Sequence, residues 1–160
     1  MRTSFLSLGF ACVASASALN LTTTTTLVSA SDMKLGAVVS CGAAGDLASD
    51  VSASLTPEAP CAGDDMTLTL DFNLASAVDS GTSTGTGSYS GIPLPTTTNP
   101  LCKAEEGNIE CPIPAGANHI EIPSSVPPET PKGGQLIIQQ SWKNDAGKQI
   151  LCVAYLLATC

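Results

Sequence analysis

Cysteine is the residue type with the clearest chemistry in this sequence. The chain holds seven cysteines, and one of them, Cys12, lies inside an N-terminal apolar run. An even number of cysteines in an exported chain predicts disulfide bonds, because thiols pair in an oxidising compartment. The cysteine count alone leaves the pairing open, since several connectivities satisfy it. The even set is Cys41, Cys61, Cys102, Cys111, Cys152 and Cys160.

The N-terminus has the features of a secretory signal peptide. Arg2 supplies a positive charge, residues 5–13 form a short apolar run, and small residues at 14–18 offer cleavage after Ala16 or Ala18. The run is too short to cross a bilayer, and no later segment is long enough. We therefore expect residues 1–18 to be removed and the mature protein to be soluble, either secreted or in the lumen of endosomes and lysosomes.

The next segment is rich in threonine and serine. It lacks any core-forming pattern, so we expect residues 19–32 to form a disordered arm and residues 33–160 to form one folded domain. Asn20 begins a glycosylation sequon, but its position beside the expected cleavage site favours an unused match.

Residues that resemble catalytic or metal-binding motifs lack the required companions. His119 is the only histidine, and its sequence neighbours offer no second metal ligand. Tyr89 stands where the serine of a nucleophile elbow is required. The acidic pairs Asp64-Asp65 and Glu105-Glu106 lack the spacing of a calcium loop. We expect no catalytic residue, no metal site and no cofactor other than a bound cargo.

The charge balance bears on possible partners. The net charge is −8, and it becomes more negative once Arg2 is removed. A nucleic acid is therefore excluded as a partner, and lasting adsorption to an anionic membrane is disfavoured, whereas brief membrane contact is allowed.

Hydrophobic periodicity indicates an all-β fold. The strongest signal is Met66, Leu68, Leu70, Phe72 and Leu74, which alternate with polar residues as in a strand with one buried face. Asn144-Asp145-Ala146-Gly147 is expected to be a hairpin turn, and prolines separate several strands. About seven strands favour a β-sandwich. The other expected strands are 34–39, 51–55, 83–92, 118–122, 135–142 and 149–157.

From Cys41 onward the chain resembles the ML domain, the MD-2-related lipid-recognition family, and within it the Niemann-Pick C2-like sterol carriers. The resemblance rests on an ordered series of short motifs rather than on any one of them. They are Cys41-Gly42, Thr56-Pro57 before Pro60-Cys61, the strand ending at Phe72, Gly91-Ile92-Pro93-Leu94-Pro95, Cys102 with Cys111-Pro112-Ile113, and Leu151-Cys152.

The resemblance implies an immunoglobulin-like β-sandwich with an internal apolar lipid cavity between its sheets. It also implies the disulfides Cys41–Cys152 and Cys102–Cys111. The family usually has a second cysteine shortly before the position of Cys61, and this chain lacks it. We predict that Cys61 pairs with Cys160 instead; the alternative is two free or intermolecular thiols.

Candidate lipid-binding residues follow from the alternating strand, the proline-rich loops and the last hairpin. Ile92, Leu94 and Val126 match loops that surround the pocket mouth in the family, and ordinary core packing is the competing role for every candidate. The full set is Leu68, Leu70, Phe72, Ile92, Leu94, Val126, Ile138, Trp142, Val153 and Tyr155.

The resemblance implies a monomeric, non-enzymatic carrier that solubilises a sterol and transfers it between membranes or to a membrane transporter. Sterol-binding members often carry aromatic residues where this chain has Thr96 and Thr130. That departure keeps a phospholipid carrier open as an alternative. A lipid-sensing co-receptor or another recognition module is the alternative from a different functional class.

Overall fold

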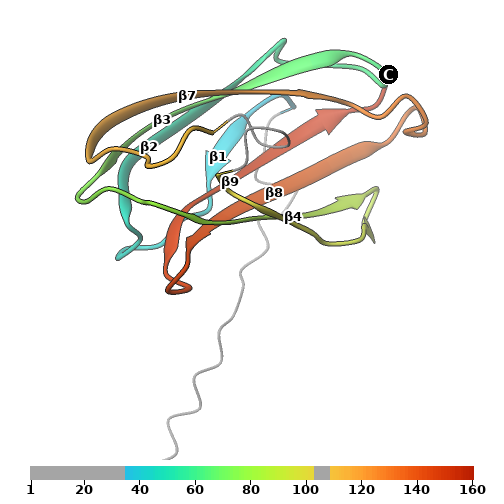
Figure 1. Ribbon diagram of the computed structural model, residues 1–160. Helices are drawn as coiled ribbons and strands as arrows, with labels where there is room; N and C mark the ends of the chain where they lie inside the picture. The colour runs from blue at the N-terminus through green and yellow to red at the C-terminus, as the bar shows by residue number, and fades with distance from the viewer. Residues whose placement is uncertain (1–34, 103–108) are drawn as a thin grey trace, which may run out of the picture.

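The computed structural model describes residues 35–102 and 109–160. All regular secondary structure in these ranges is β, and the strands form two antiparallel sheets (Figure 1). The predicted signal peptide (1–18), the predicted arm (19–32) and Asn20 lie outside the described residues. The expected all-β sandwich is confirmed.

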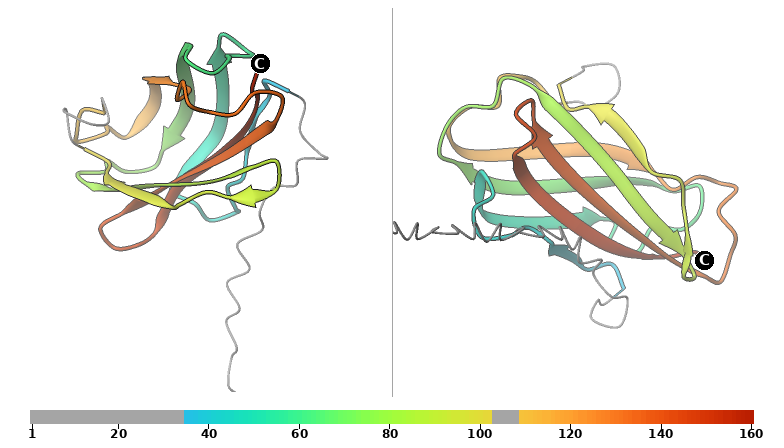
Figure 2. Two further views of the ribbon diagram at one scale, coloured as in Figure 1. Left: turned by 90° about the vertical axis from the view of Figure 1, so that its right-hand side faces the viewer. Right: turned by 90° about the horizontal axis from the view of Figure 1, so that it is seen from below.

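The larger sheet has six strands in the order β1-β9-β8-β4-β5, with β6 also paired to β4. The smaller sheet has three strands in the order β2-β3-β7. The two sheets lie face to face, as both views in Figure 2 show. The strand bounds are β1 (Val38–Ser40), β2 (Ala48–Thr56), β3 (Asp65–Leu74), β4 (Gly81–Tyr89), β5 (Ile92–Pro93), β6 (Thr97–Pro100), β7 (Gly116–Ser125), β8 (Gln135–Asn144) and β9 (Gln149–Ala158).

The alternating segment is β3, the central strand of the smaller sheet. Its apolar residues are buried and its polar residues face outward or lie near the surface, as the period of two predicts. Leu68 lies opposite Leu55 of β2 and Ile122 of β7, and Leu70 lies opposite Ile120. This register places one apolar face of the smaller sheet toward the larger sheet.

The last hairpin supplies the centre of the larger sheet. Trp142 of β8 is 0% exposed and meets Phe72 of β3 edge-on, with ring centroids 6.2 Å apart and planes at 84°. Such a T-shaped aromatic pair stabilises the packing beyond the area it buries. This contact ties the two sheets together at the middle of the core.

The turn between β8 and β9 forms where the sequence predicts it. Gly147 has φ +75°, and its amide donates to the Asn144 carbonyl at 2.8 Å. The Asn144 side chain accepts a hydrogen bond from the Lys148 amide at 2.9 Å. Glycine adopts this positive φ without steric cost, which explains its place in the turn.

The proline-rich segment differs from expectation. The strand expected over 83–92 is interrupted, because Ser90 and Gly91 have φ values of 47° and 84° and turn the chain back on itself. Ile92–Pro93 then pairs with the end of β4, and Thr97–Pro100 pairs with its beginning. Both short strands lie at the sheet edge, where proline is tolerated because no partner needs its missing amide hydrogen.

Three disulfides fasten the sandwich, and they join the cysteines in the expected pairs. Cys41–Cys152 links the segment after β1 to β9 inside the larger sheet. Cys102–Cys111 closes a short loop with a sequence separation of 9. Cys61–Cys160 ties the end of the chain to the segment before β3, with a sequence separation of 99.

Removing the Cys61–Cys160 bond should destabilise the protein more than removing the Cys102–Cys111 bond. The longer loop restricts the unfolded chain more, so the loss should be ~4–5 kcal/mol against ~2–3 kcal/mol in the chain-entropy model. Chemical denaturation of the paired Cys→Ser variants at both sites checks this order. A smaller loss for the Cys61→Ser/Cys160→Ser variant would contradict it.

Candidate functional site

The space between the sheets is the candidate site. The structure brings eight of the ten predicted lipid-binding residues into one apolar cluster there. Seven of them are buried, and Ile138 is half-buried against the others. The eight are Leu68, Leu70, Phe72, Val126, Ile138, Trp142, Val153 and Tyr155.

The two sides of the sandwich differ in how closely the sheets approach. The sheets meet where β1 and β9 lie against β2. The opposite side is bordered by β4 and β7, and the core-facing isoleucines Ile120 and Ile122 of β7 are only half-buried there. These half-buried side chains mark an apolar strip on the β4–β7 side, where the described residues cover the core least.

The inner face of β4 contributes little bulk to this strip. Gly85 and Gly87 lie opposite Gln140 and Ile138 of β8, so both glycines belong to the core-facing row of the sheet. Neighbouring atoms approach both glycines closely: a β-carbon at Gly85 would lie 2.9 Å from Thr97 Oγ1, and one at Gly87 would lie 2.7 Å from the Ile137 carbonyl oxygen. Tyr89 ends the row, and its hydroxyl donates a hydrogen bond to the Pro131 carbonyl at 3.0 Å.

A small cavity lies between the sheets at the beginning of β4. Its volume is about 70 Å³, and its lining includes Trp142 from the larger sheet and Ile122 from the smaller sheet. Ser83 and Gln140 add polar groups, and Gln140 Nε2 donates to Ser83 Oγ at 3.2 Å. This is a polar region in an otherwise apolar interior.

The other two predicted lipid-binding residues lie outside the core cluster. Ile92 is 66% exposed and Leu94 is 41% exposed. Leu94 lines a separate hollow of about 440 Å³ with Ile137 and Gln139, which alternate with the core-facing residues of β8. This hollow therefore opens on the outer face of the larger sheet, and Thr96 also lines it. Thr130 is the second position at which sterol-binding members of the family often carry an aromatic residue. It is half-buried in a turn, where its amide donates to the Pro127 carbonyl.

Burial makes the interior a poor solvent for charge. Tyr155 is 7% exposed and faces the core, and this burial raises the pKa of its hydroxyl to about 12. A phenolate is disfavoured there because little water can solvate it. The same environment favours neutral, apolar molecules.

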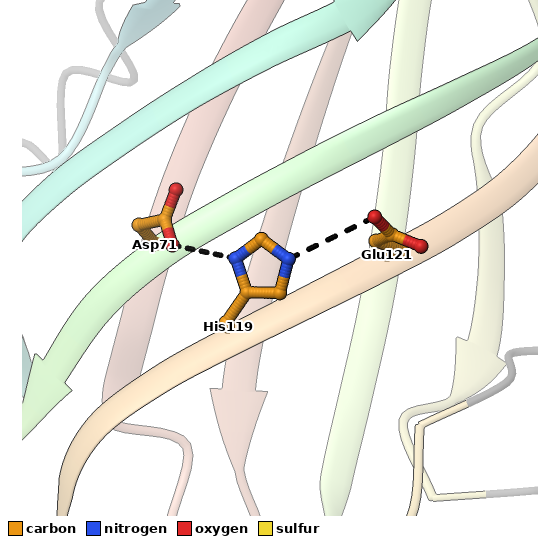
Figure 3. Close-up of polar contacts among 3 residues, drawn as sticks. All are labelled: Asp71, His119 and Glu121. Atoms are coloured by element: carbon orange, nitrogen blue, oxygen red, sulfur yellow. Dashed lines mark hydrogen bonds and ion pairs between the residues drawn. The ribbon is translucent and has the colours of Figure 1, made fainter.

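The outer face of the smaller sheet carries the histidine. His119 Nδ1 lies 2.7 Å from Asp71 Oδ1, and Nε2 lies 3.8 Å from Glu121 Oε1 (Figure 3). The hydrogen bond and negative charge of Asp71, with a smaller contribution from Glu121, raise the pKa of His119 above 6.5. The position is exposed and lies on an edge strand. The sequence neighbours of His119 gave no sign of this partner, because Asp71 lies on β3 and comes close only through the pairing of β3 with β7.

Neither a metal centre nor a membrane-spanning helix is present in the described parts of the chain. Between residues 35 and 102 and from 109 onward, no cluster of three or more His, Cys, Asp and Glu side chains is placed to hold a metal ion. In the same ranges, no helix has the length and apolar character needed to cross a membrane.

Comparison with known proteins identifies the family. A family model described as the ML domain matches residues 37–158. The chain belongs to the ML-domain family. No curated protein sequence matches it significantly.

Solved structures share the ML fold with this chain at low sequence identity. A Niemann-Pick type C2 protein from the Japanese carpenter ant aligns with a TM-score of 0.60 and 17% identity, covering 78% of this chain and 99% of the ant protein. Chicken MD-1 complexed with lipid IVa aligns with a TM-score of 0.55 and 14% identity, covering 74% of this chain and 85% of MD-1. These two structures support the fold, and the family model over residues 37–158 confirms the family that the motifs predicted.

Strand β7 supplies candidate residues that sequence reasoning left out. Ile120 and Ile122 border the apolar strip, and their alternation with His119 and Glu121 was the available signal. They were recognised only as part of a strand. Strand β7 pairs with β3 on one side only, so it forms an edge of the smaller sheet, and Ile120 and Ile122 lie on that edge strand.

Replacing Asp71 should lower the pKa of His119. The Asp71→Asn variant loses the negative charge that favours the imidazolium, whereas Glu121→Gln should produce a smaller shift because Glu121 lies farther away. Titration of the single imidazole by NMR measures both effects. Since folding raises this pKa, the stability it contributes is fully present below pH 6.5 and is lost as pH rises through the folded-state pKa. An unchanged His119 pKa in Asp71→Asn would contradict the assignment.

Proposed function

We propose that this protein is a secreted or lumenal lipid carrier that solubilises a sterol and transfers it between membranes or to a membrane transporter. Membership of the ML-domain family, over residues 37–158, is the observation that carries the proposal. The apolar space between the two sheets is the proposed binding site. The protein acts by binding and release and needs no catalytic residue.

The physical basis of binding is removal of apolar surface from water. Burial is worth ~25 cal/mol per Å², so a sterol-sized molecule gains several kcal/mol before the costs of association are subtracted. The half-buried side chains of Ile120, Ile122 and Ile138 already lie at the less covered side of the core. A ligand that parts β4 from β7 would complete their burial.

The exposed apolar residues support brief contact with a membrane during delivery. Ile92 and Leu94 project from the edge segment that follows the Ser90-Gly91 turn. A net charge of −8 opposes lasting adsorption to anionic lipid, so the contact should be transient. We propose a monomer as the working state.

The compartment follows from the cysteines and the N-terminus. Three disulfides are typical of secreted or lumenal proteins. We propose that residues 1–18 direct export, that residues 19–32 form an arm, and that the ML domain begins near residue 33.

A phospholipid or related lipid is the second candidate cargo, and a lipid-sensing co-receptor is the second candidate role. The structural neighbour chicken MD-1 is complexed with lipid IVa, which supports a ligand other than a sterol. Thr96 and Thr130, where sterol-binding relatives often have rings, support a wider choice of lipid.

A competition titration separates these candidates. The delipidated protein is titrated with a fluorescent sterol, and then unlabelled sterol or phospholipid is added. Saturable one-to-one sterol binding, with transfer between vesicles, supports the sterol carrier. Displacement by phospholipid alone supports the second cargo. Binding without vesicle transfer supports a recognition role.

Adding bulk to the inner face of β7 should block lipid binding. Ile120→Phe places a larger ring beside the apolar strip, and we expect at least a tenfold loss of affinity with the fold retained. Glu121→Phe adds a ring to the opposite face of the same strand and should leave affinity unchanged. Fluorescent-lipid titration and thermal unfolding of both variants measure these effects. Equal affinity in the two variants would place the site elsewhere.

A further inference from the structure

The disulfide Cys61–Cys160 joins the two sheets at one end of the sandwich. Cys61 lies just before β3 of the smaller sheet, and Cys160 follows β9 of the larger sheet. At this end, marked C in Figure 1, β7 finishes and β8 begins, and we call it the clamped end. Cys102–Cys111 lies at the opposite end, in the connection that leads into β7, and Cys41–Cys152 joins two segments of the larger sheet. Among the three disulfides, only Cys61–Cys160 therefore holds the sheets together at the clamped end.

Both cysteines of this bond follow or precede backbone that is well fastened to its own sheet. On the smaller sheet, the Gly63 amide donates to the Val126 carbonyl at 2.8 Å, and the Val126 amide donates to the Asp64 carbonyl at 3.0 Å. On the larger sheet, Thr159 is 1% exposed, its amide donates to the Gly134 carbonyl at 3.1 Å, and its hydroxyl accepts from the Gly134 amide at 2.8 Å. Because each anchor is fixed to its own sheet, the disulfide sets the spacing of the sheets at this end.

The other covalent link at the clamped end is the connection between β7 and β8, and it is loosely held. Residues 127–132 of this connection are exposed, apart from the half-buried Thr130. Among the described residues, one hydrogen bond joins this segment to another part of the protein, from the Tyr89 hydroxyl to the Pro131 carbonyl at 3.0 Å. A segment with so few buried contacts belongs to the least stable parts of a fold. The disulfide is therefore the strongest single tie between the sheets at this end.

The same disulfide is the one that a reductant reaches most directly. Cys160 is exposed and Cys61 is half-buried, whereas Cys152 is 3% exposed and the remaining three paired cysteines are half-buried. A thiolate must reach a sulfur atom to attack it, so access governs the rate of thiol–disulfide exchange. Exposed disulfides are accordingly the labile and regulatory ones in proteins. Exposure thus distinguishes Cys61–Cys160 from the other two bonds.

We infer that Cys61–Cys160 is a redox-sensitive clamp, which a dithiol reductant opens so that the carrier releases its lipid. A thiolate of the dithiol attacks the Cys160 sulfur, the bond to Cys61 breaks, and the Cys61 thiolate takes up a proton. The second thiol of the reductant, after losing its proton, displaces Cys160, which leaves as a thiolate and is protonated. The dithiol is thereby oxidised to a disulfide, and both cysteines are reduced to thiols. The inference rests on the proposed carrier function and specifies what triggers release.

Opening the clamp changes one end of the sandwich and keeps the fold. Cys41–Cys152 still holds β9 in the larger sheet, and the apolar cluster still joins the two sheets. The spacing of the sheets becomes adjustable next to Val126, which is 1% exposed at the clamped end. A lipid held between the sheets can then leave faster, although the surface that binds it is still present.

Graded reduction of the wild-type protein tests both steps. The oxidised protein is loaded with a fluorescent sterol or, separately, a fluorescent phospholipid, and is incubated with increasing dithiothreitol. Alkylation and peptide mapping then give the state of each cysteine, and transfer of the lipid to acceptor vesicles is followed in parallel. Cys61 and Cys160 should be alkylated at about tenfold less dithiothreitol than the other paired cysteines. Lipid transfer should become several-fold faster over the same range, while the fluorescence of the single tryptophan stays native.

Two paired variants separate the clamp from disulfides in general. Cys61→Ser/Cys160→Ser should transfer lipid at the rate of the reduced wild type and should not respond to low dithiothreitol. Cys102→Ser/Cys111→Ser keeps the clamp, so it should transfer lipid slowly and respond as the wild type does. Thermal unfolding establishes that each variant is folded, and the wild-type titration decides the question without them.

The outcomes distinguish failure of the inference from failure of the carrier function. Earlier reduction of either other disulfide, or reduction of all three together with unfolding, overturns the inference and leaves the carrier intact. Selective reduction of Cys61–Cys160 with an unchanged rate of lipid transfer also overturns it, because the bond is then a structural staple. If neither sterol nor phospholipid binds the oxidised protein, the proposed function fails and the inference fails with it.

Discussion

Apolar contact between the two sheets is the constraint on which the rest of this structure depends. Phe72 and Trp142 meet at the centre of that contact, and Leu70 beside them is 0% exposed. A slip of one residue in β3 would turn its whole apolar row toward water, so the contact also fixes the register of β2 and β7. The same constraint makes each unpaired polar atom in the interior costly.

The two sheets pack less closely on the β4–β7 side, and the inner-facing residues of β4 there are smaller than those of β9. Strand β9 is buried from Ile150 to Leu157, whereas the inner row of β4 contains Gly85 and Gly87. The glycines of β4 add little bulk of their own to the apolar strip that we propose as the lipid site. The Cys61–Cys160 and Cys41–Cys152 bonds hold the opposite part of the sandwich, so opening beside β4 need not loosen the whole fold.

Features set by local pattern were predictable from the sequence, and features set by strand pairing were not. The alternation of Met66 to Leu74 predicted β3, and Asn144 to Gly147 predicted the last turn. The break at Ser90-Gly91 was missed because the residues on either side still read as a strand. The family resemblance supplied two of the disulfide pairs, since the cysteine count allows many pairings, and the third pair was predicted between the two cysteines left over. The Asp71 partner of His119 required the register between β3 and β7.

The predicted site shows the same division. The period of its strand predicted that Leu68 faces the core, and Leu68 lies there together with Tyr155 from the last hairpin. Their role in lipid binding stays a prediction. Ile92 and Leu94 were assigned to the pocket mouth by resemblance, and their exposure depends on how the short strand β5 leaves the sheet edge. No sequence signal indicated that the indole nitrogen of Trp142 lacks an acceptor among residues 35–102 and 109–160, because a core pattern carries no information about the partner of that nitrogen.

The central claim is that the space between the sheets carries a lipid. Native mass spectrometry of the protein purified from a secreting host, followed by extraction and identification of any bound molecule, tests it most directly. The account predicts one bound lipid per monomer, sterol-sized for the favoured cargo and phospholipid-sized for the second. A protein that stays free of lipid after purification, and after incubation with sterol and phospholipid vesicles, would contradict the account.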